Sequence, residues 1–238
     1  MKKEIHVAGD PKGTAEQFID FLKDFCAGKE RVTIALSGGS TPKLLFDLLA
    51  AAPKTLDWSK LHFFWGDERC VPPDHEESNY KMTFDHLLSH IDMPAENIHR
   101  VRGEADPVTE ADRSGKELLA FCTVVNDLPS IDLNILGMGD DGHTASIFPH
   151  QMELLAAEQL CAVATHPTSD QKRVTLTGPV INNSHTVAFL VTGEKKAQKI
   201  RSILGEEADA SDYPASHVSP RAELRWFLDQ GAYALVER

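Results

Sequence analysis

The stretch LNILGMGDDGHTASIFP, residues 133–149, joins an apolar run to a loop that carries three glycines, two aspartates and a histidine. Residues 131–136, IDLNIL, predict a buried strand, and the glycines that follow end it. The hexapeptide Gly137-Met138-Gly139-Asp140-Asp141-Gly142 also matches the dinucleotide-binding pattern G-x-G-x-x-G. The loop therefore has two interpretations, a nucleotide cradle or the holder of a catalytic group.

The nucleotide interpretation fits the residues poorly. A dinucleotide fingerprint places a helix N-terminus against the pyrophosphate, but here Asp140 and Asp141 occupy the variable positions and would repel that group. Pro149 excludes a long helix after the loop. A dinucleotide site also needs an acidic residue at the end of a second strand, about twenty residues after the glycines. In this chain that region has the sequence MELLAAEQL, which favours a helix instead. We therefore interpret the loop as catalytic.

His143 is the expected catalytic group of this loop. A histidine on a glycine-rich loop after a strand can be exposed and oriented, and its imidazole can exchange a proton near neutral pH. The carboxylate of either Asp140 or Asp141 could accept the proton of one ring nitrogen and leave the other nitrogen free as a base. The sequence offers no second ligand pair at metal-binding spacing, so we expect neither a metal nor another cofactor.

Outward from this stretch, apolar strands alternate with amphipathic helices. A helix is expected to begin at Pro42, because proline suits the first helical position. The remaining pattern predicts strands at 31–36, 61–65, 161–165, 173–177 and 185–192, helices at 79–90, 107–125 and 194–204, and a short strand and a last helix near the C-terminus. The expected fold class is α/β, Rossmann-like, with a mainly parallel sheet covered by helices on both faces.

Ligands of such sheets bind beyond the carboxyl ends of the strands. Three glycine- or charge-rich loops, 37–42, 66–72 and 137–149, leave strands at those ends, and we expect them to form one site.

The first of these loops, Ser37-Gly38-Gly39-Ser40-Thr41-Pro42, is expected to bind an anion. Its glycines allow close backbone approach, Ser40 or Thr41 can cap the helix, and the free N–H groups of the first turn attract negative charge. An alternative is a nucleophile elbow with Ser37 as an esterase nucleophile. Only about 36 residues precede Ser37, whereas that elbow normally follows several strands.

The second loop, Gly66-Asp67-Glu68-Arg69, follows the strand LHFFW. The planar fork of Arg69 suits a phosphate or carboxylate, and Asp67 could orient a sugar hydroxyl. The following VPPDHEESNY is expected to be a loop over the site that ends at a helix cap near Ser78 or Asn79.

Bulk composition limits the partners. The 238-residue chain carries a net charge of −12, which disfavours nucleic acid and anionic membranes. Four separated cysteines, no apolar run of transmembrane length and no signal-peptide pattern favour a cytoplasmic protein. No linker or repeat divides the sequence, so one domain, 1–238, is expected, as a monomer or homodimer.

Taken together, the three loops resemble the 6-phosphogluconolactonase family, whose fold is shared with glucosamine-6-phosphate deaminases. Two further segments, Arg173-Val174-Thr175-Leu176-Thr177 and Thr192-Gly193-Glu194-Lys195-Lys196, extend the resemblance over nearly the whole chain. It implies hydrolysis of 6-phosphoglucono-1,5-lactone in the oxidative pentose phosphate pathway, with His143 as general base toward water. It also implies a phosphate pocket formed by Ser40, Thr41, Arg69, Arg173 and Lys196, with Lys195 as an alternative to Lys196.

Two related activities stay open at this point. Deaminases of this fold carry a glutamate in an F-N-E-P stretch after the histidine, whereas this chain has Ser146-Ile147-Phe148-Pro149, so the lactonase is favoured. A sugar-phosphate sensor would keep the phosphate cradle without needing His143.

Overall fold

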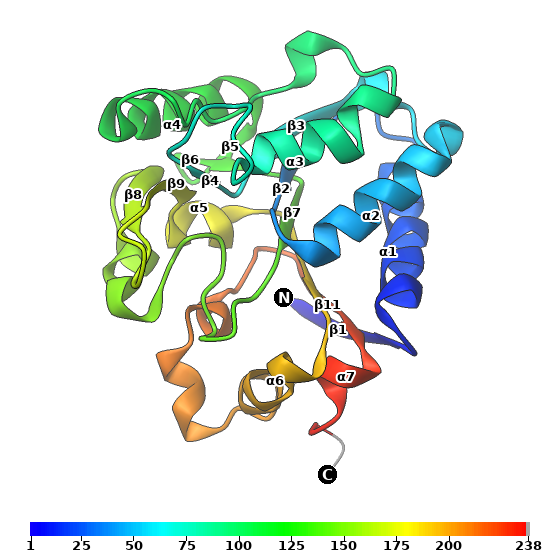
Figure 1. Ribbon diagram of the computed structural model, residues 1–238, viewed down its shortest axis with the longest axis vertical. Helices are drawn as coiled ribbons and strands as arrows, with labels where there is room; N and C mark the ends of the chain where they lie inside the picture. The colour runs from blue at the N-terminus through cyan, green and yellow to red at the C-terminus, as the bar shows by residue number, and fades with distance from the viewer. Residues whose placement is uncertain (237–238) are drawn as a thin grey trace.

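Six strands pair side by side, all in parallel, in the order β1-β11-β10-β7-β2-β3, in a computed structural model that describes residues 1–236 (Figure 1). Their bounds are β1 Lys2–Ala8, β2 Val32–Leu36, β3 Leu61–Trp65, β7 Leu133–Leu136, β10 Thr186–Val191 and β11 Glu223–Asp229. Every residue of β2, β7 and β10 is buried, as expected for strands covered on both faces. The predicted α/β fold class with a mainly parallel sheet is therefore confirmed.

Helices flank the sheet on both sides, with α1 and α2 on one side and α5 on the other (Figure 1). The α-helices are α1 Pro11–Cys26, α2 Ser40–Ala51, α3 Asn79–His86, α4 Pro107–Phe121, α5 Gly178–Asn183, α6 Ala197–Leu204 and α7 Gln230–Tyr233. Short 3₁₀ helices are η1 Pro53–Thr55, η2 Trp58–Lys60, η3 Leu88–His90, η4 Ala95–Asn97, η5 Pro149–Ala156, η6 Glu194–Lys196, η7 Ala208–Asp212 and η8 Pro214–His217.

A second, antiparallel sheet stands beside the central one. It has the order β4-β9-β8, with β4 Asp67–Arg69, β8 Cys161–Thr165 and β9 Lys172–Leu176, and α4 packs against it. The stretch 66–72, expected to be a loop, therefore contains a strand. The segments predicted at 161–165 and 173–177 are strands, but they belong to this small sheet rather than the parallel one.

Four helix predictions need correction here. The helix expected at 107–125 ends at Phe121, because the β-branched residues that follow form β5 Thr123–Val125 in a hairpin with β6 Leu128–Ser130. The two residues of its turn, Asn126 and Asp127, have φ of 53° and 61°, as a type I′ turn requires. The predicted helices 79–90 and 194–204 are each part α-helix and part 3₁₀ helix, and MELLAAEQL contains 3₁₀ structure up to Ala156.

The N-terminal β1 and α1 have no counterpart among the elements predicted from the sequence. Strand β1 lies at the edge of the sheet and is mostly exposed, so it lacks a continuous apolar run. Its partner β11 comes from the other end of the chain and was predicted only as a short strand.

Candidate active site

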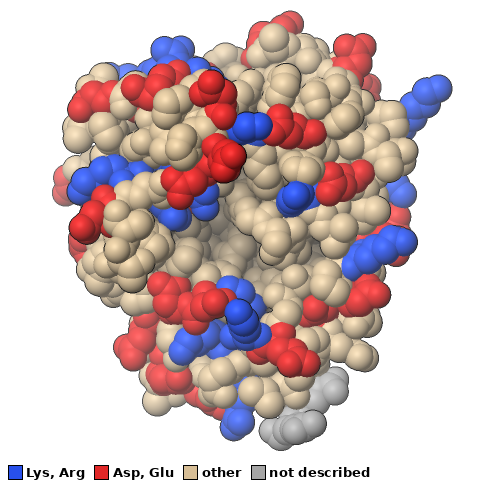
Figure 2. Space-filling view, in the orientation of Figure 1, with Lys and Arg blue, Asp and Glu red and all other residues tan. Residues whose placement is uncertain are grey.

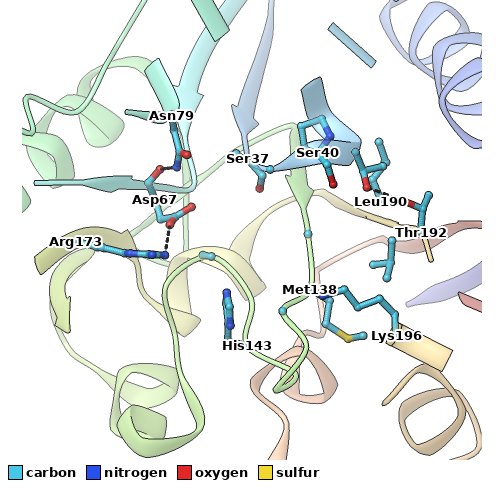
Figure 3. A pocket seen from close by; sticks show the side chains of 18 of the residues that line it. Ser37, Ser40, Asp67, Asn79, Met138, His143, Arg173, Leu190, Thr192 and Lys196 are labelled. Carbon is cyan, nitrogen blue, oxygen red and sulfur yellow. Dashed lines mark hydrogen bonds and ion pairs between the residues drawn. The ribbon is translucent and has the colours of Figure 1, made fainter. Parts of the chain in front are cut away.

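The loops that leave the carboxyl ends of β2, β3, β7 and β10 surround one cavity of about 250 Å³ (Figure 3). On the molecular surface it is a hollow with basic side chains near its rim (Figure 2). Its lining contains every predicted substrate-binding residue and His143: Ser37, Gly38, Gly39, Ser40, Thr41, Asp67, Arg69, His143, Arg173 and Lys196. It also contains residues that were not predicted as site residues, among them Asn79, Met138, Leu190 and Thr192.

The glycine loop after β2 presents the N-terminus of α2 to this cavity. The helix begins at Ser40 rather than Pro42, and its N-cap is Gly39, whose φ of 110° suits glycine. The expected side-chain cap from Ser40 or Thr41 is wrong, since no side chain caps this helix. Thr41 Oγ1 instead lies 2.9 Å from Thr192 Oγ1. The first-turn N–H groups are thus free of a side-chain cap, and they favour an anion.

Ser37 does not have the surroundings of a nucleophile. Its side chain is buried, and its hydroxyl donates to the carbonyl of Ile135 at 2.6 Å. The neighbouring Gly38 packs so tightly that a Cβ there would lie 1.9 Å from Asn79 Oδ1. Ser37 and Gly38 therefore shape the wall of the cavity, and nothing here supports the nucleophile-elbow alternative.

Two arginines stand opposite each other at one end of the cavity. Arg69 on β4 pairs in register with Arg173 on β9. Each has a buried Nε that finds no hydrogen-bond partner within residues 1–236. Burial lowers the pKa of Arg173, and the charge of Arg69 lowers it further, although Asp67 acts the other way. Like charges placed face to face repel, so this arrangement favours the arrival of an anion.

Asp67 joins this basic end to the loop 137–149 that follows β7. Its Oδ2 accepts a hydrogen bond from Ser146 Oγ at 2.6 Å and lies 3.9 Å from Arg173 Nη1 (Figure 3). Its carbonyl accepts from Asn79 Nδ2 at 2.8 Å. Asp67 is 6% exposed but lines the cavity, so the predicted contact with a sugar hydroxyl is a contact inside the cavity.

Glu68 is a positioning group that the sequence did not reveal. Its buried carboxylate accepts backbone hydrogen bonds from Arg69, Asn79 and Tyr80 at 2.7–2.8 Å, and one from the hydroxyl of Ser78. Burial raises the pKa of Glu68, although the hydrogen bonds oppose this shift. The carboxylate ties β4 to the start of α3, where Ser78 is the N-cap as predicted. It thereby fixes both Arg69 and Asn79 against the cavity.

The loop after β7, residues 137–149, holds His143 through Asp141. His143 Nδ1 lies 2.6 Å from Asp141 Oδ1, which also accepts the His143 backbone N–H at 3.1 Å. Burial acts to raise the pKa of Asp141, but the hydrogen bonds and charge of His143 outweigh it and lower the pKa to about 2. Because an ionised carboxylate can only accept, Nδ1 carries the ring proton and Nε2 is free to act as a base.

The other aspartate of the loop has a different partner. Asp140 Oδ1 lies 2.5 Å from Lys196 Nζ, and this hydrogen bond is the main cause of the lowered pKa of Asp140. The geometry thus separates the two carboxylates that the sequence left as alternatives. Lys196 lines the cavity, whereas its neighbour Lys195 is not among the lining residues.

Two findings concern metals and membranes. Within residues 1–236, no group of three or more His, Cys, Asp or Glu side chains is arranged to hold a metal ion. Over the same residues, no helix combines the length and the apolar character that crossing a bilayer requires.

A parallel sheet with a glycine cradle and a His–Asp pair at its strand ends, and two arginines supplied by the neighbouring small sheet, forms a site suited to a small anionic substrate. Residues 11–226 match the family described as glucosamine-6-phosphate isomerases/6-phosphogluconolactonase, and the chain belongs to that family.

Individual relatives agree with this assignment. The chain is 45% identical to a 6-phosphogluconolactonase of Haemophilus influenzae over 86% of this chain and 88% of the relative. It is 40% identical to a 6-phosphogluconolactonase of Nostoc sp. over 98% of both chains. Among solved structures, 6-phosphogluconolactonase of Thermotoga maritima superposes with a TM-score of 0.84 at 28% identity, covering 96% of this chain and 100% of that one.

Proposed function

We propose that this enzyme hydrolyses 6-phospho-D-glucono-1,5-lactone to 6-phospho-D-gluconate with His143 as the general base toward water. The lactonase activity rests on relatives of that name at 40–45% identity over most of the chain. The role of His143 rests on one observation: its imidazole pairs with Asp141 at 2.6 Å and lines the cavity that also contains the basic groups.

The phosphate group of the substrate serves for binding and takes no part in the reaction. The first turn of α2 at one side of the cavity, and Arg69, Arg173 and Lys196 around it, provide positive charge for this group. Their grip places C1 of the lactone near the imidazole, so that binding energy is used for positioning. Three basic side chains and one carboxylate, Asp67, line the cavity, so the cavity is locally basic although the chain has a net charge of −12.

Hydrolysis then needs one proton carrier. Nε2 of His143 takes a proton from water while the water oxygen forms a bond to C1, which gives a tetrahedral oxyanion. The oxyanion collapses, the bond between C1 and the ring oxygen breaks, and the ring oxygen receives the proton from Nε2. The carboxylate of Asp141 keeps Nδ1 protonated and stabilises the imidazolium that forms between the two steps. No metal or cofactor is needed in this sequence of steps.

The residues disfavour the two related activities. A deaminase needs further acid–base groups for ring opening and isomerisation, but in the stretch Ser146-Ile147-Phe148-Pro149 the side chains of Ile147 and Phe148 are fully buried and apolar. A sensor needs only the groups that bind the phosphate, and the Asp141–His143 pair would then serve no catalytic step.

We also propose that 1–238 is a single lactonase domain, whose last two residues lie outside the described part. The pairing of β1 with β11 supports this, because it joins the two ends of the chain in one sheet. A cytoplasmic location, and a monomeric or homodimeric state, are proposed with it. Size-exclusion chromatography with light scattering tests the oligomeric state.

The activity is tested by supplying the purified chain with fresh 6-phosphogluconolactone and, separately, with glucosamine 6-phosphate. We expect acid release from the lactone above its spontaneous hydrolysis and no ammonia from the amino sugar. Ammonia release would identify a deaminase, and binding of 6-phosphogluconate without turnover of either compound would identify a sensor.

A further inference from the structure

The catalytic loop is braced from outside the cavity by residues 205–218, here called the bracing segment. This segment follows α6 and contains the 3₁₀ helices η7 and η8. In Figure 1 it lies beside the loop that follows β7, and the Ala215 N–H donates to the carbonyl of Gly142 at 3.1 Å. The contact falls on the residue directly between Asp141 and His143.

Tyr213 packs closely against this loop at Gly142. A Cβ placed on Gly142 would lie 2.7 Å from Tyr213 Cβ and 2.8 Å from its ring atoms Cγ and Cδ1. Gly142 has a φ of 84°, a value that glycine adopts easily. Because glycine has no Cβ, its own backbone preferences do not restrict it to this conformation. The Tyr213 side chain therefore closes one side of a turn whose own backbone is permissive.

The phenol end of Tyr213 is fixed by charged partners. Its hydroxyl accepts a hydrogen bond from Lys199 Nζ at 2.9 Å and donates to Asp209 at 2.8 Å. Lys199 lies on α6, so the ring is tied both to that helix and to its own segment. Tyr213 is 9% exposed and does not line the cavity, so any effect on the reaction is indirect, and Gly142 is the loop residue against which its ring packs.

We propose that Tyr213 is a positioning residue: its ring holds the Gly142 turn so that Asp141 and His143 stay paired with Nε2 facing the cavity. This inference rests on the proposed role of His143. Without the ring, the permissive glycine can sample other conformations, and the reactive pairing is then only one of several. Turnover falls with the population of that pairing, whereas Arg69, Arg173 and the first turn of α2 lie on other elements and keep their affinity for the phosphate.

The test compares Tyr213→Ala with Tyr213→Phe, which keeps the ring and loses only the hydroxyl. For Tyr213→Ala we expect kcat to fall by about 10-fold or more while KM stays within about two-fold, since a misplaced catalytic group costs turnover rather than binding. Tyr213→Phe should keep kcat within about three-fold, because the ring still backs the turn. Tyr213→Leu replaces the alanine variant if that one does not fold.

A spectroscopic readout separates positioning from general damage. The proton shared by His143 Nδ1 and Asp141 should give a downfield NMR signal in the wild-type enzyme, and Tyr213→Ala should broaden or lose it. Val218→Ala is the matched control, because Val218 is a buried apolar residue of the same segment. It should keep both the signal and kcat.

His143→Ala serves as the reference for the proposed function. If His143→Ala is inactive but Tyr213→Ala keeps wild-type kcat and the NMR signal, the positioning role is refuted and the catalytic role stands. An equal fall of kcat in Val218→Ala would also refute it. Wild-type turnover in His143→Ala would instead overturn the proposed mechanism itself.

Discussion

Replacing Gly139 with alanine should disturb the pairing of His143 with Asp141 without substituting either residue. A Cβ at position 139 would lie 2.1 Å from His143 Nδ1, 2.2 Å from its Cε1 and 2.6 Å from Asp141 Oδ1. Gly139 is not among the glycines with positive φ, so alanine brings no left-handed backbone penalty. The added methyl group therefore acts on the side chains of the pair.

The size of the displacement sets the expected effect. Ordinary van der Waals contact begins at 3.4 Å, so the imidazole must move by the difference from 2.1 Å, about 1.3 Å, if it alone gives way. A misplacement of about 1 Å can cost roughly 100-fold in rate. We expect kcat to fall by about that factor and KM to change little, because the phosphate-binding groups are on other loops.

The assay follows acid release from freshly made lactone in weak buffer, with spontaneous hydrolysis subtracted. Gly9→Ala is the control for the substitution, because a Cβ at Gly9 meets nothing within 4 Å and Gly9 does not line the cavity. Equal kcat in Gly139→Ala and Gly9→Ala would refute the view that the contact between Asp141 and His143 is needed for turnover.

Three further perturbations probe other parts of the molecule. Arg173→Ala should raise KM by roughly 10- to 150-fold with kcat nearly unchanged, because it removes a charged hydrogen bond to the phosphate worth about 1.5–3 kcal/mol. An unchanged KM in steady-state kinetics would contradict the phosphate-binding role of Arg173. Phe18→Ala should cost about 3–5 kcal/mol in urea unfolding, because Phe18 is fully buried against Phe227; a loss below 1 kcal/mol would mean that α1 contributes little. Burial acts to raise the pKa of Glu110, but hydrogen bonds from Arg113 and other groups outweigh it and lower the pKa below 4.5 overall. The stability of the fold should therefore fall as the pH drops below that value. Glu110→Gln should flatten this fall in acid titrations followed by circular dichroism.

The central strands were readable from the sequence because each is a short, mostly apolar run, as expected for a strand covered on both faces. The carboxyl ends of parallel strands share one edge of a sheet, so the convergence of the glycine and charge-rich loops followed as well. Strand β1 was missed because its exposed residues alternate with half-buried ones at the sheet edge. The local signals of α1, an Asp10 cap and Pro11 at its first turn, were present.

Within the site, residue types were predictable and pairings were not. The loop 137–149 identified His143 and two carboxylates, but only the folded loop shows that Asp141 contacts the imidazole and Asp140 contacts Lys196. Such pairings depend on the conformation of a glycine-rich loop, which sequence spacing does not fix. The groups that support the site from elsewhere, Glu68 under Arg69 and Tyr213 behind Gly142, act through contacts that no local motif encodes.

Turnover and binding by His143→Ala test the proposed mechanism most directly. The kcat for the lactone, corrected for spontaneous hydrolysis, should fall by roughly 10²–10⁴-fold. The Kd for 6-phosphogluconate, measured by titration calorimetry, should stay within about two-fold, because the phosphate contacts remain. Wild-type kcat in this variant would remove the imidazole from the reaction, and a loss of affinity equal to the loss of rate would assign it to binding instead.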